Sequence, residues 1–213
     1  ATGTARDHRI DIGHPRAAAV MVVNIQNIRH VIDFKASLAQ APTNSAQCYN
    51  PLGIDHHPWL TNMLITRRLE FDAGHRIPYH ASQCRHLHGH RYALEITLSG
   101  EIIRTEGAAE QGMVMDFSDV KAVANTVLVN HWDHAFLVYQ GDRAVVEFLA
   151  SLPEHKTVVL PMVPTVENLA AEAFRILDAA YLDSYGNQLR LHRVRLYETP
   201  NNWADAVRQG QTE

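Results

Sequence analysis

The alternation of apolar and polar positions divides this chain near residue 63. After that point three segments, 64–75, 88–98 and 191–198, place apolar side chains at every second position, as strands with one buried face do. The apolar faces carry Leu69, Phe71 and Ala73; Tyr92, Leu94, Ile96 and Leu98; and Val194 and Leu196. A β-bulge in any of these strands would change which side chains share a face.

Two further segments repeat apolar residues at the three- and four-residue spacing of a one-sided helix. The first follows Asp116 and the second follows Thr165, a suitable N-cap, and ends near Gly186. Their apolar positions are Val120, Val123, Ala124, Val127 and Leu128, and Val166, Leu169, Ala170, Ala173, Phe174 and Leu177. The apolar run 158–160 predicts one more short strand. This order predicts an α+β fold with both helices on one face of an antiparallel sheet.

The first 62 residues show no sustained period of 2 or 3.6. We expect residues 1–62 to be an extension of uncertain order and residues 63–213 to form the working domain. The adjacent histidines His56 and His57 in the extension fit a solvated loop better than a metal site. The apolar stretch 17–23 is soon followed by charged residues, so we do not interpret it as a signal peptide.

Composition narrows the class of protein. A net charge of -4 and a pI near 6.4 argue against a dedicated nucleic-acid binder, which would carry a basic surface. The two cysteines, Cys48 and Cys84, lie in different contexts, so we expect no disulfide framework and a reducing, cytoplasmic compartment. No apolar run approaches the roughly 18 residues that a membrane span needs.

Three histidines carry the clearest chemical signal. His88 and His90 are two positions apart and therefore project from the same face of a strand, and His75 ends the apolar face of another strand. Three imidazole ligands with one open position are typical of a catalytic zinc, whereas structural zinc usually has four protein ligands. Chance proximity is the alternative, because the chain has 14 His.

Other candidate residues leave alternatives open. The thiol of Cys84, four residues before His88, suits a base or nucleophile, a fourth metal ligand, or a buried thiol. In the pair Asp133-His134 the carboxylate could fix the imidazole tautomer, although such pairs are usually solvated. A buried Glu198 could accept two hydrogen bonds from an amidine-like edge, whereas an exposed strand-end glutamate is the ordinary reading. Glu167 is explained by the dipole of its helix alone.

Six motifs in order resemble the 6-pyruvoyltetrahydropterin synthase / 6-carboxytetrahydropterin synthase family. They are Phe71-Asp72-Ala73-Gly74-His75, Cys84-x3-His88-Gly89-His90, Met115-Asp116-Phe117, Asp133-His134, Pro164-Thr165-Val166-Glu167-Asn168 and Tyr197-Glu198-Thr199. The resemblance covers Met63 to about Trp203. Three residues between Cys84 and His88 resemble the bacterial 6-carboxytetrahydropterin synthases of the queuosine and deazapurine pathway, since pyruvoyl-forming members usually have five. The glutamates that mark two other subgroups are absent: one position is Cys84 and the other is Ala81.

The resemblance implies a tunnelling fold, in which a four-stranded antiparallel sheet with two helices assembles through sheet edges into barrels. It also implies a homo-oligomer, often a hexamer of two trimers, with sites at subunit interfaces. Cys84, the Asp133-His134 pair and the metal then need not come from one chain.

The implied reaction converts 7,8-dihydroneopterin triphosphate to 6-carboxy-5,6,7,8-tetrahydropterin, acetaldehyde and triphosphate. His75, His88 and His90 would bind Zn²⁺. Cys84 would be the general base, with His134 as a second acid/base oriented by Asp133. Glu198, helped by Thr165 and Glu167, would hold the pterin edge, and Arg76, Arg85 and Arg91 are candidates for the triphosphate. The alternatives are triphosphate elimination to a 6-pyruvoyl product and a non-catalytic zinc- or pterin-binding module.

Overall fold

The computed structural model describes residues 62–210. Cys48, His56, His57 and all but the last residue of the expected N-terminal extension therefore lie outside the described residues. The strands are β1 (Met63–His75), β2 (His88–Gly100), β3 (Ala135–Tyr139), β4 (Thr157–Leu160), β5 (Leu189–Thr199) and β6 (Asn202–Val207). The α-helices are α1 (Phe117–Ala124), α2 (Asn130–Trp132), α3 (Arg143–Ser151) and α4 (Val166–Tyr185). A π-helical segment, Asn125–Val129, joins α1 to α2, and 3₁₀ turns span Gln83–Arg85 and Gly186–Gln188.

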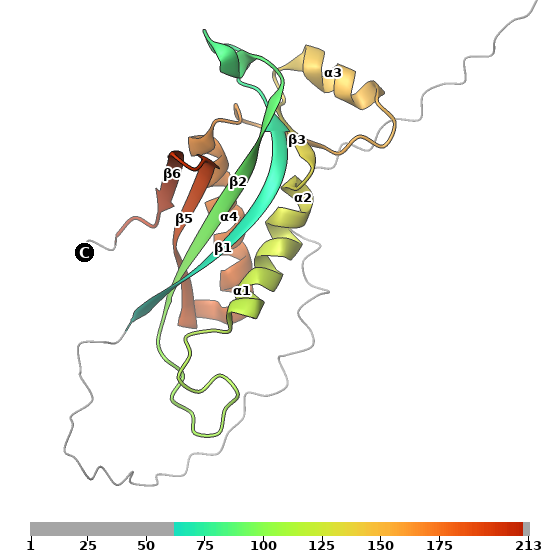
Figure 1. The fold of residues 1–213 in the computed structure, drawn as a ribbon. Helices are drawn as coiled ribbons and strands as arrows, with labels where there is room; N and C mark the ends of the chain where they lie inside the picture. Colours follow the sequence, from blue (N-terminus) through green and yellow to red (C-terminus); the bar gives the residue numbers. More distant parts are fainter. Residues whose placement is uncertain (1–61, 211–213) are drawn as a thin grey trace, which may run out of the picture.

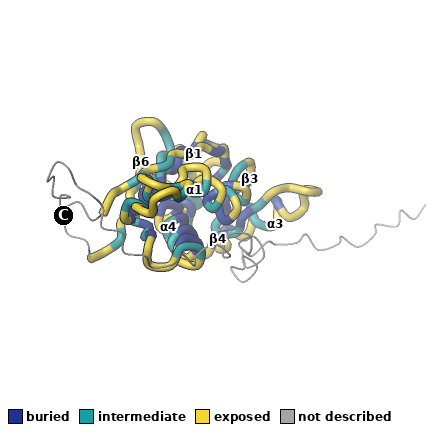
Figure 2. The backbone as a smooth tube through the Cα atoms, turned by 90° about the horizontal axis from the view of Figure 1, so that it is seen from below, coloured by how far each residue is buried: buried dark blue, intermediate teal, exposed yellow. Residues whose placement is uncertain are grey.

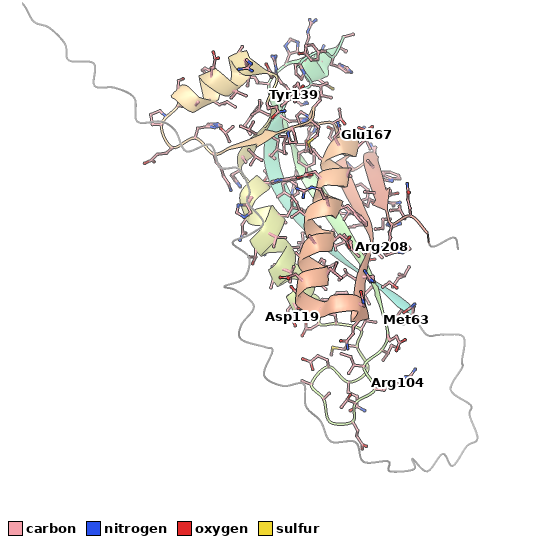
Figure 3. The ribbon with its side chains drawn as sticks, turned by 180° about the vertical axis from the view of Figure 1, so that it is seen from behind. Met63, Arg104, Asp119, Tyr139, Glu167 and Arg208 are labelled. Carbon is pink, nitrogen blue, oxygen red and sulfur yellow. The ribbon has the colours of Figure 1, made fainter. Side chains whose placement is uncertain are left out.

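The strands form one curled sheet that α1 and α4 cover on the same face (Figure 1; seen from behind in Figure 3). Buried residues concentrate between the sheet and these helices, as Figure 2 shows from below. Tyr92, Leu94, Ile96 and Leu98 on β2 are all fully buried, which confirms the face predicted from their alternation. The expected α+β class with two long helices on one face is therefore correct. No helix among residues 62–210 is long and apolar enough to cross a membrane.

The sheet differs from the prediction in strand number and direction. It has six strands in the order β4-β3-β1-β2-β5-β6, not four, and it is mixed, not antiparallel. β3 pairs in parallel with the last three residues of β1, and β4 pairs in parallel with β3. Helix α3 supplies the crossover that a parallel β3–β4 pair requires. The predicted strand at 158–160 is confirmed as β4.

The pairing of β1 with β2 places the histidines at one end of the sheet. The two strands are antiparallel from Met63 opposite Gly100 to His75 opposite His88. His75 and His88 are therefore direct cross-strand neighbours, whose side chains come closest in an antiparallel pair. The motif Gly-His after His88 then returns His90 to the same face.

Two irregularities in β5 change its alternation. The register with β2 shifts between Thr97 and Leu98, leaving His192 as an extra residue, so that Leu191 and Val194 are both fully buried. The register with β6 shifts between Tyr197 and Thr199, leaving Glu198 as an extra residue. Bulges re-aim single side chains, and the second one lies at the predicted substrate residue.

The helix ends follow the predicted signals. The Thr165 side chain accepts a hydrogen bond from the Asn168 N–H and caps α4, which ends at Gly186 with φ 60°, a conformation that favours glycine. The Asp116 side chain accepts from the Ser118 N–H and caps α1. The π-helical segment follows α1 and lets the consecutive residues Val127, Leu128 and Val129 all be buried. Such segments often lie at functional sites, and this one leads directly into α2 and Asp133.

Candidate active site

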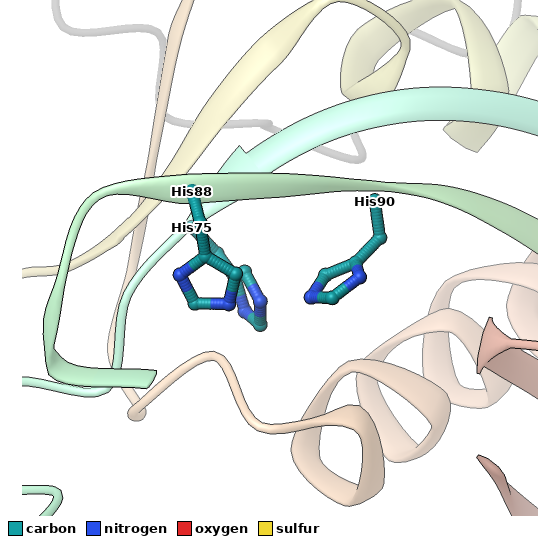
Figure 4. Close-up of side chains that lie close together, drawn as sticks. All are labelled: His75, His88 and His90. Atoms are coloured by element: carbon teal, nitrogen blue, oxygen red, sulfur yellow. The ribbon is translucent and has the colours of Figure 1, made fainter. Parts of the chain in front are cut away.

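The rings of His75, His88 and His90 converge at one end of the core, on the helix-covered face of β1 and β2 (Figure 4). Ring centroids are 4.5 Å apart for His75–His88, 5.1 Å for His75–His90 and 5.0 Å for His88–His90. One ligand nitrogen from each ring lies within 4.8 Å of the others. The three side chains can therefore share one metal ion.

Hydrogen bonds fix the orientation of two of these rings. His75 Nδ1 lies 2.8 Å from the Pro164 carbonyl, and His88 Nδ1 lies 2.8 Å from the His86 carbonyl. A carbonyl can only accept, so each Nδ1 carries its proton and each Nε2 keeps a free lone pair. Such carbonyl partners commonly orient metal-binding histidines.

The protonation of the cluster also fits a metal. Burial, only partly opposed by the hydrogen bond to Pro164, lowers the pKa of His75 from 6.5 to about 4. Burial likewise lowers the pKa of His90, although the Glu198 charge opposes this. Both rings are thus neutral near pH 7. Within residues 62–210 their Nε2 atoms are buried without a hydrogen-bond partner, and metal coordination would satisfy these atoms.

Glu198 borders the histidine cluster. Its Oε1 lies 3.5 Å from His75 Nε2 and 3.9 Å from His90 Nε2, and its side chain is about one-fifth exposed. Glu198 shares its face of β5 with the buried residues Val194 and Leu196, which directs its carboxylate to the helix-covered side of the sheet. Glu198 is not one of the three residues whose ligand atoms converge, which are His75, His88 and His90. Its carboxylate is therefore available to a bound ligand.

Asp133 and His134 do form a hydrogen-bonded pair. His134 Nδ1 lies 2.9 Å from Asp133 Oδ1, because a turn with His134 at φ 57° brings the neighbouring side chains together. The strand β1 holds this turn twice: the Asp72 N–H donates to Asp133 Oδ1 at 3.0 Å, and the His134 N–H donates to the Asp72 carbonyl at 2.6 Å. Asp133 is therefore positioned to orient the His134 ring.

The charge on Asp133 is favoured as well. Desolvation disfavours the ionised carboxylate, but the Asp72 N–H, the hydrogen bond to His134 and the charges of His134 and Lys156 together lower the pKa of Asp133. An ionised Asp133 accepts a hydrogen bond from His134 Nδ1, which leaves Nε2 as the ring nitrogen that can exchange a proton.

Within one chain the Asp133-His134 pair and the histidine cluster lie on different faces of the sheet. Asp72 and His75 are three residues apart on β1 and so point to opposite faces. The Asp72 and Asp133 carboxylates and the His134 ring have ligand atoms within 4.8 Å of one another, whereas His75 is fully buried on the core side. The His134 side chain is 77% exposed and faces outward from the chain.

The remaining predicted residues lie near the site but outside its contacts. Cys84 carries a half-buried free thiol in the 3₁₀ turn, and its backbone carbonyl accepts a hydrogen bond from the Ile77 N–H. The thiol is part neither of the histidine cluster nor of the group around Asp133. Thr165 caps α4, directly after the Pro164 carbonyl that holds His75. Glu167 is exposed in the first turn of the same helix, as Figure 3 shows.

The structure separates the three candidate arginines. Arg76 makes two bonds to the buried carboxylate of Asp142, at 2.5 and 3.0 Å, and Arg91 pairs with Glu70 at 3.0 Å. Arg85 is exposed in the 3₁₀ turn and has no ion pair within the described part of the chain. It is the arginine of the three whose charge is available to an anion.

Sequence reasoning missed the groups that support the site. The backbone of Asp72, the Pro164 carbonyl and Lys156 hold site residues that are distant along the chain. No local sequence pattern indicates such long-range contacts. Tyr92 could have been found, because it shares its face with His88 and His90. Its ring stacks on Phe71 at 5.3 Å, and its buried hydroxyl has no hydrogen-bond partner among residues 62–210.

Comparison with known proteins agrees with this geometry. The sequence pattern of the 6-pyruvoyl tetrahydropterin synthase family matches residues 64–209. A 6-carboxy-5,6,7,8-tetrahydropterin synthase of Rickettsia bellii is 37% identical over 64% of this chain and 94% of its own length. A protein of the same name from Haemophilus influenzae is 31% identical over 66% of this chain and 96% of its own length. One from Synechocystis is 39% identical over 64% of this chain and 86% of its own length.

Solved structures share the fold. A Caenorhabditis elegans 6-pyruvoyl tetrahydropterin synthase superposes with a TM-score of 0.50 at 24% identity, over 70% of this chain and 96% of that one. The Plasmodium vivax enzyme of the same name gives 0.51 at 19% identity, over 68% and 98%. The histidine cluster, the fold and the match across residues 64–209 lead to the same conclusion: the chain belongs to the 6-pyruvoyl tetrahydropterin synthase family.

Proposed function

We propose that this protein is a zinc-dependent lyase that converts 7,8-dihydroneopterin triphosphate to 6-carboxy-5,6,7,8-tetrahydropterin, with release of acetaldehyde and triphosphate. The observation that carries the proposal is the convergence of the three imidazoles of His75, His88 and His90 at one place. The names of the curated relatives support the product, as does the three-residue spacing between Cys84 and His88.

We assign Zn²⁺ to His75, His88 and His90. Three imidazole nitrogens suit a catalytic zinc, which would have a fourth position for a substrate oxygen. A bound zinc ion acidifies hydroxyl groups and stabilises negative charge on oxygen. The chain contributes the orientation: the Pro164 and His86 carbonyls hold two rings with Nε2 directed inward.

Glu198 holds the pterin in this proposal. The edge of a pterin presents an amidine-like pair of N–H groups, and an ionised carboxylate accepts both in parallel. Glu198 lies beside His75 and His90, so a pterin bound there extends its side chain toward the metal ligands. Thr165 and Glu167 lie at the start of α4, directly after the Pro164 carbonyl that holds His75, and help Glu198 in this proposal. Arg85 is available to the triphosphate.

Cys84 and His134 move the protons. We assign Cys84 as the general base at the side-chain carbon and His134, oriented by Asp133, as the second acid/base. His134 faces outward in its own chain, so it acts on the site of a neighbouring subunit. The protein then works as a homo-oligomer, with a hexamer of two trimers expected, and each site lies at a subunit interface.

The test incubates the purified, zinc-loaded full chain with 7,8-dihydroneopterin triphosphate and measures acetaldehyde, triphosphate and the pterin product. We expect acetaldehyde and 6-carboxytetrahydropterin in equal amounts. The His88→Ala variant is the control, because it lacks one metal ligand and should release neither.

Two other results would contradict the proposal in different ways. Triphosphate released with a 6-pyruvoyl pterin and no acetaldehyde would identify a pyruvoyl-type synthase. Pterin binding without any product would identify a non-catalytic binding module. The second alternative conflicts with the hydrogen-bonded Asp133-His134 pair, which a binding module has no need to maintain.

A further inference from the structure

Lys156 lies against the turn that carries Asp133 and His134. Its Nζ donates to the Asn130 carbonyl at 2.8 Å and to the Asp133 carbonyl at 2.5 Å. Asn130 begins α2, the last turn of the helical segment that starts with α1, and Asp133 is the C-cap of α2. The carbonyls of a last helical turn lack partners within the helix. A cation there is also favoured by the helix dipole.

The position of Lys156 is itself fixed by the sheet. It directly precedes β4, and its carbonyl accepts from the Phe136 N–H at 2.9 Å, which ties it to β3. The residues from Ala135 to Leu160, the β3–α3–β4 unit, therefore return the chain to the Asp133-His134 turn. Sequence reasoning gave this unit no functional role.

The turn needs such support. His134 has φ 57°, a left-handed conformation that is disfavoured for a residue with a side chain. On one side the backbone of Asp72 holds the turn through the Asp133 side chain and the His134 N–H. On the other side Lys156 binds the Asp133 carbonyl. The peptide that joins Asp133 to His134 is thus held between β1 and the lysine.

We propose that Lys156 is a positioning residue for catalysis: by binding the Asn130 and Asp133 carbonyls it keeps the His134 ring aimed at the substrate in the neighbouring subunit. This inference rests on the proposed function, in which His134 transfers a proton. The ammonium group of Lys156 binds two backbone carbonyls. Its effect on catalysis therefore acts through the position of the turn. Small misplacement of a catalytic group lowers the rate much more than the binding.

The first experiment measures kcat and KM for Lys156→Met in the zinc-loaded full chain. We expect kcat to fall about tenfold and KM to change less than about twofold, because the substrate-binding residues are untouched. Lys156→Arg should recover most of the loss, since a guanidinium can also donate to both carbonyls. Lys121→Met, which removes an exposed lysine on α1, is the matched control and should keep full activity.

A double-mutant cycle separates positioning from a general loss of structure. If Lys156 acts through His134, Lys156→Met should lower kcat less than about twofold in a His134→Ala background. An equal tenfold loss of kcat in both backgrounds overturns the proposal. So does a wild-type kcat for the single variant Lys156→Met if the single variant His134→Ala is inactive. Full activity of His134→Ala would instead refute the assigned acid/base.

Amide hydrogen exchange tests the same contact without turnover. The His134 N–H is bonded to Asp72, so we expect it to exchange at least about tenfold faster in Lys156→Met, while the β1–β2 amides stay protected. Unchanged exchange overturns the proposal even if the wild-type protein proves inactive with this substrate. Hydrogen exchange therefore tests the role of Lys156, and the acetaldehyde assay tests the proposed reaction, so that the two proposals can be refuted separately.

Discussion

At the residue scale, the proposed site separates groups that hold a metal from groups that move protons. His88 is one of three convergent imidazoles, whereas Cys84 belongs to neither ligand group. We therefore predict that Cys84→Ala keeps its zinc but loses at least about 100-fold in kcat, the usual contribution of a general base. His88→Ala should lose both zinc and turnover. Metal analysis of the purified variants together with the acetaldehyde assay checks both statements.

The metal content of Cys84→Ala decides the role of the thiol. A variant that retains the metal but not the activity agrees with a general base. If zinc is lost together with activity, then Cys84 is a fourth ligand in the assembled protein and the assignment made here is wrong.

Burial of His75 predicts a pH dependence of stability in the metal-free protein. Its pKa is lowered from 6.5 to about 4, so the unfolded chain binds a proton more readily than the folded one between these values. The contribution of neutral His75 to the free energy of unfolding is then fully present above pH 6.5 and is lost as the pH falls toward 4. The loss is about 3 kcal/mol at most, given about 1.4 kcal/mol for each pKa unit.

The variant His75→Asn tests this cause. Its amide can still donate to the Pro164 carbonyl in place of Nδ1 but does not titrate. Urea unfolding of both metal-free proteins at pH 7 and pH 4.5 should show a smaller difference for the variant. An equal difference in the two proteins would place the pH dependence elsewhere.

The sequence supports predictions at the residue scale only where residues are close along the chain. Strand alternation was enough to bring His88 and His90 together and to align them with His75. The Asp133-His134 contact needed a turn with positive φ, which no local pattern indicated. Lys156 is 23 residues from Asp133, and only the topology of β3 and β4 brings the two together.

At the element scale, the joint between β1 and β3 has little room. A Cβ added to Gly74 would lie 2.6 Å from Phe136 Cδ2, and Gly74 and Phe136 form the middle one of the three residue pairs between these strands. We predict that Gly74→Ala destabilises the protein by about 1–3 kcal/mol, the usual cost of overpacking. It should also weaken zinc binding, because the neighbouring residue is His75. Urea unfolding and zinc titration measure the two effects.

The double variant Gly74→Ala/Phe136→Ala identifies the clash. With the ring removed, the added methyl group should cost less than about 0.5 kcal/mol relative to Phe136→Ala alone. A cost that persists without the ring would assign the effect to the backbone of β1 instead.

Two strands that the sequence pattern did not predict, β3 and β6, explain why the sheet was predicted incompletely. β3 is a five-residue apolar run, and β6 contributes only Ala204 and Ala206 to the core, so neither shows a clear alternation. The β3 pairing with β1 covers three residues, and such short parallel contacts depend on α3 and β4 being in place. The long elements β1, β2, α1 and α4 were predictable because each buries a periodic apolar face.

At the scale of the whole molecule, the single chain leaves strand edges free. β1 pairs with β3 only through Ala73 to His75, so 63–71 have no strand partner on that side within the part of the chain described, and β6 ends the sheet. Exposed edges of this length favour pairing with another chain. A closed homo-oligomer would cover them and would also bring an outward-facing His134 to a neighbouring histidine cluster.

Subunit mixing tests this arrangement. Glu198 lies beside His75 and His90, whereas His134 faces outward, so Glu198→Ala and His134→Ala disable the two halves of a shared site. Co-expressed as differently tagged chains and purified through both tags, the two inactive variants should regain about a quarter of wild-type activity, since random assembly pairs two intact halves in one site of four.

The two homogeneous variants are the controls, and a chain with both substitutions mixed with wild type completes the set. Recovery in the first mixture requires that one active site draws Glu198 and His134 from different chains, because neither variant contains an intact set. If both residues of a site came from one chain, the mixed oligomer would be as inactive as its parents. The two faces of the sheet would then have to meet within a single subunit, which the opposite orientations of Asp72 and His75 on β1 oppose.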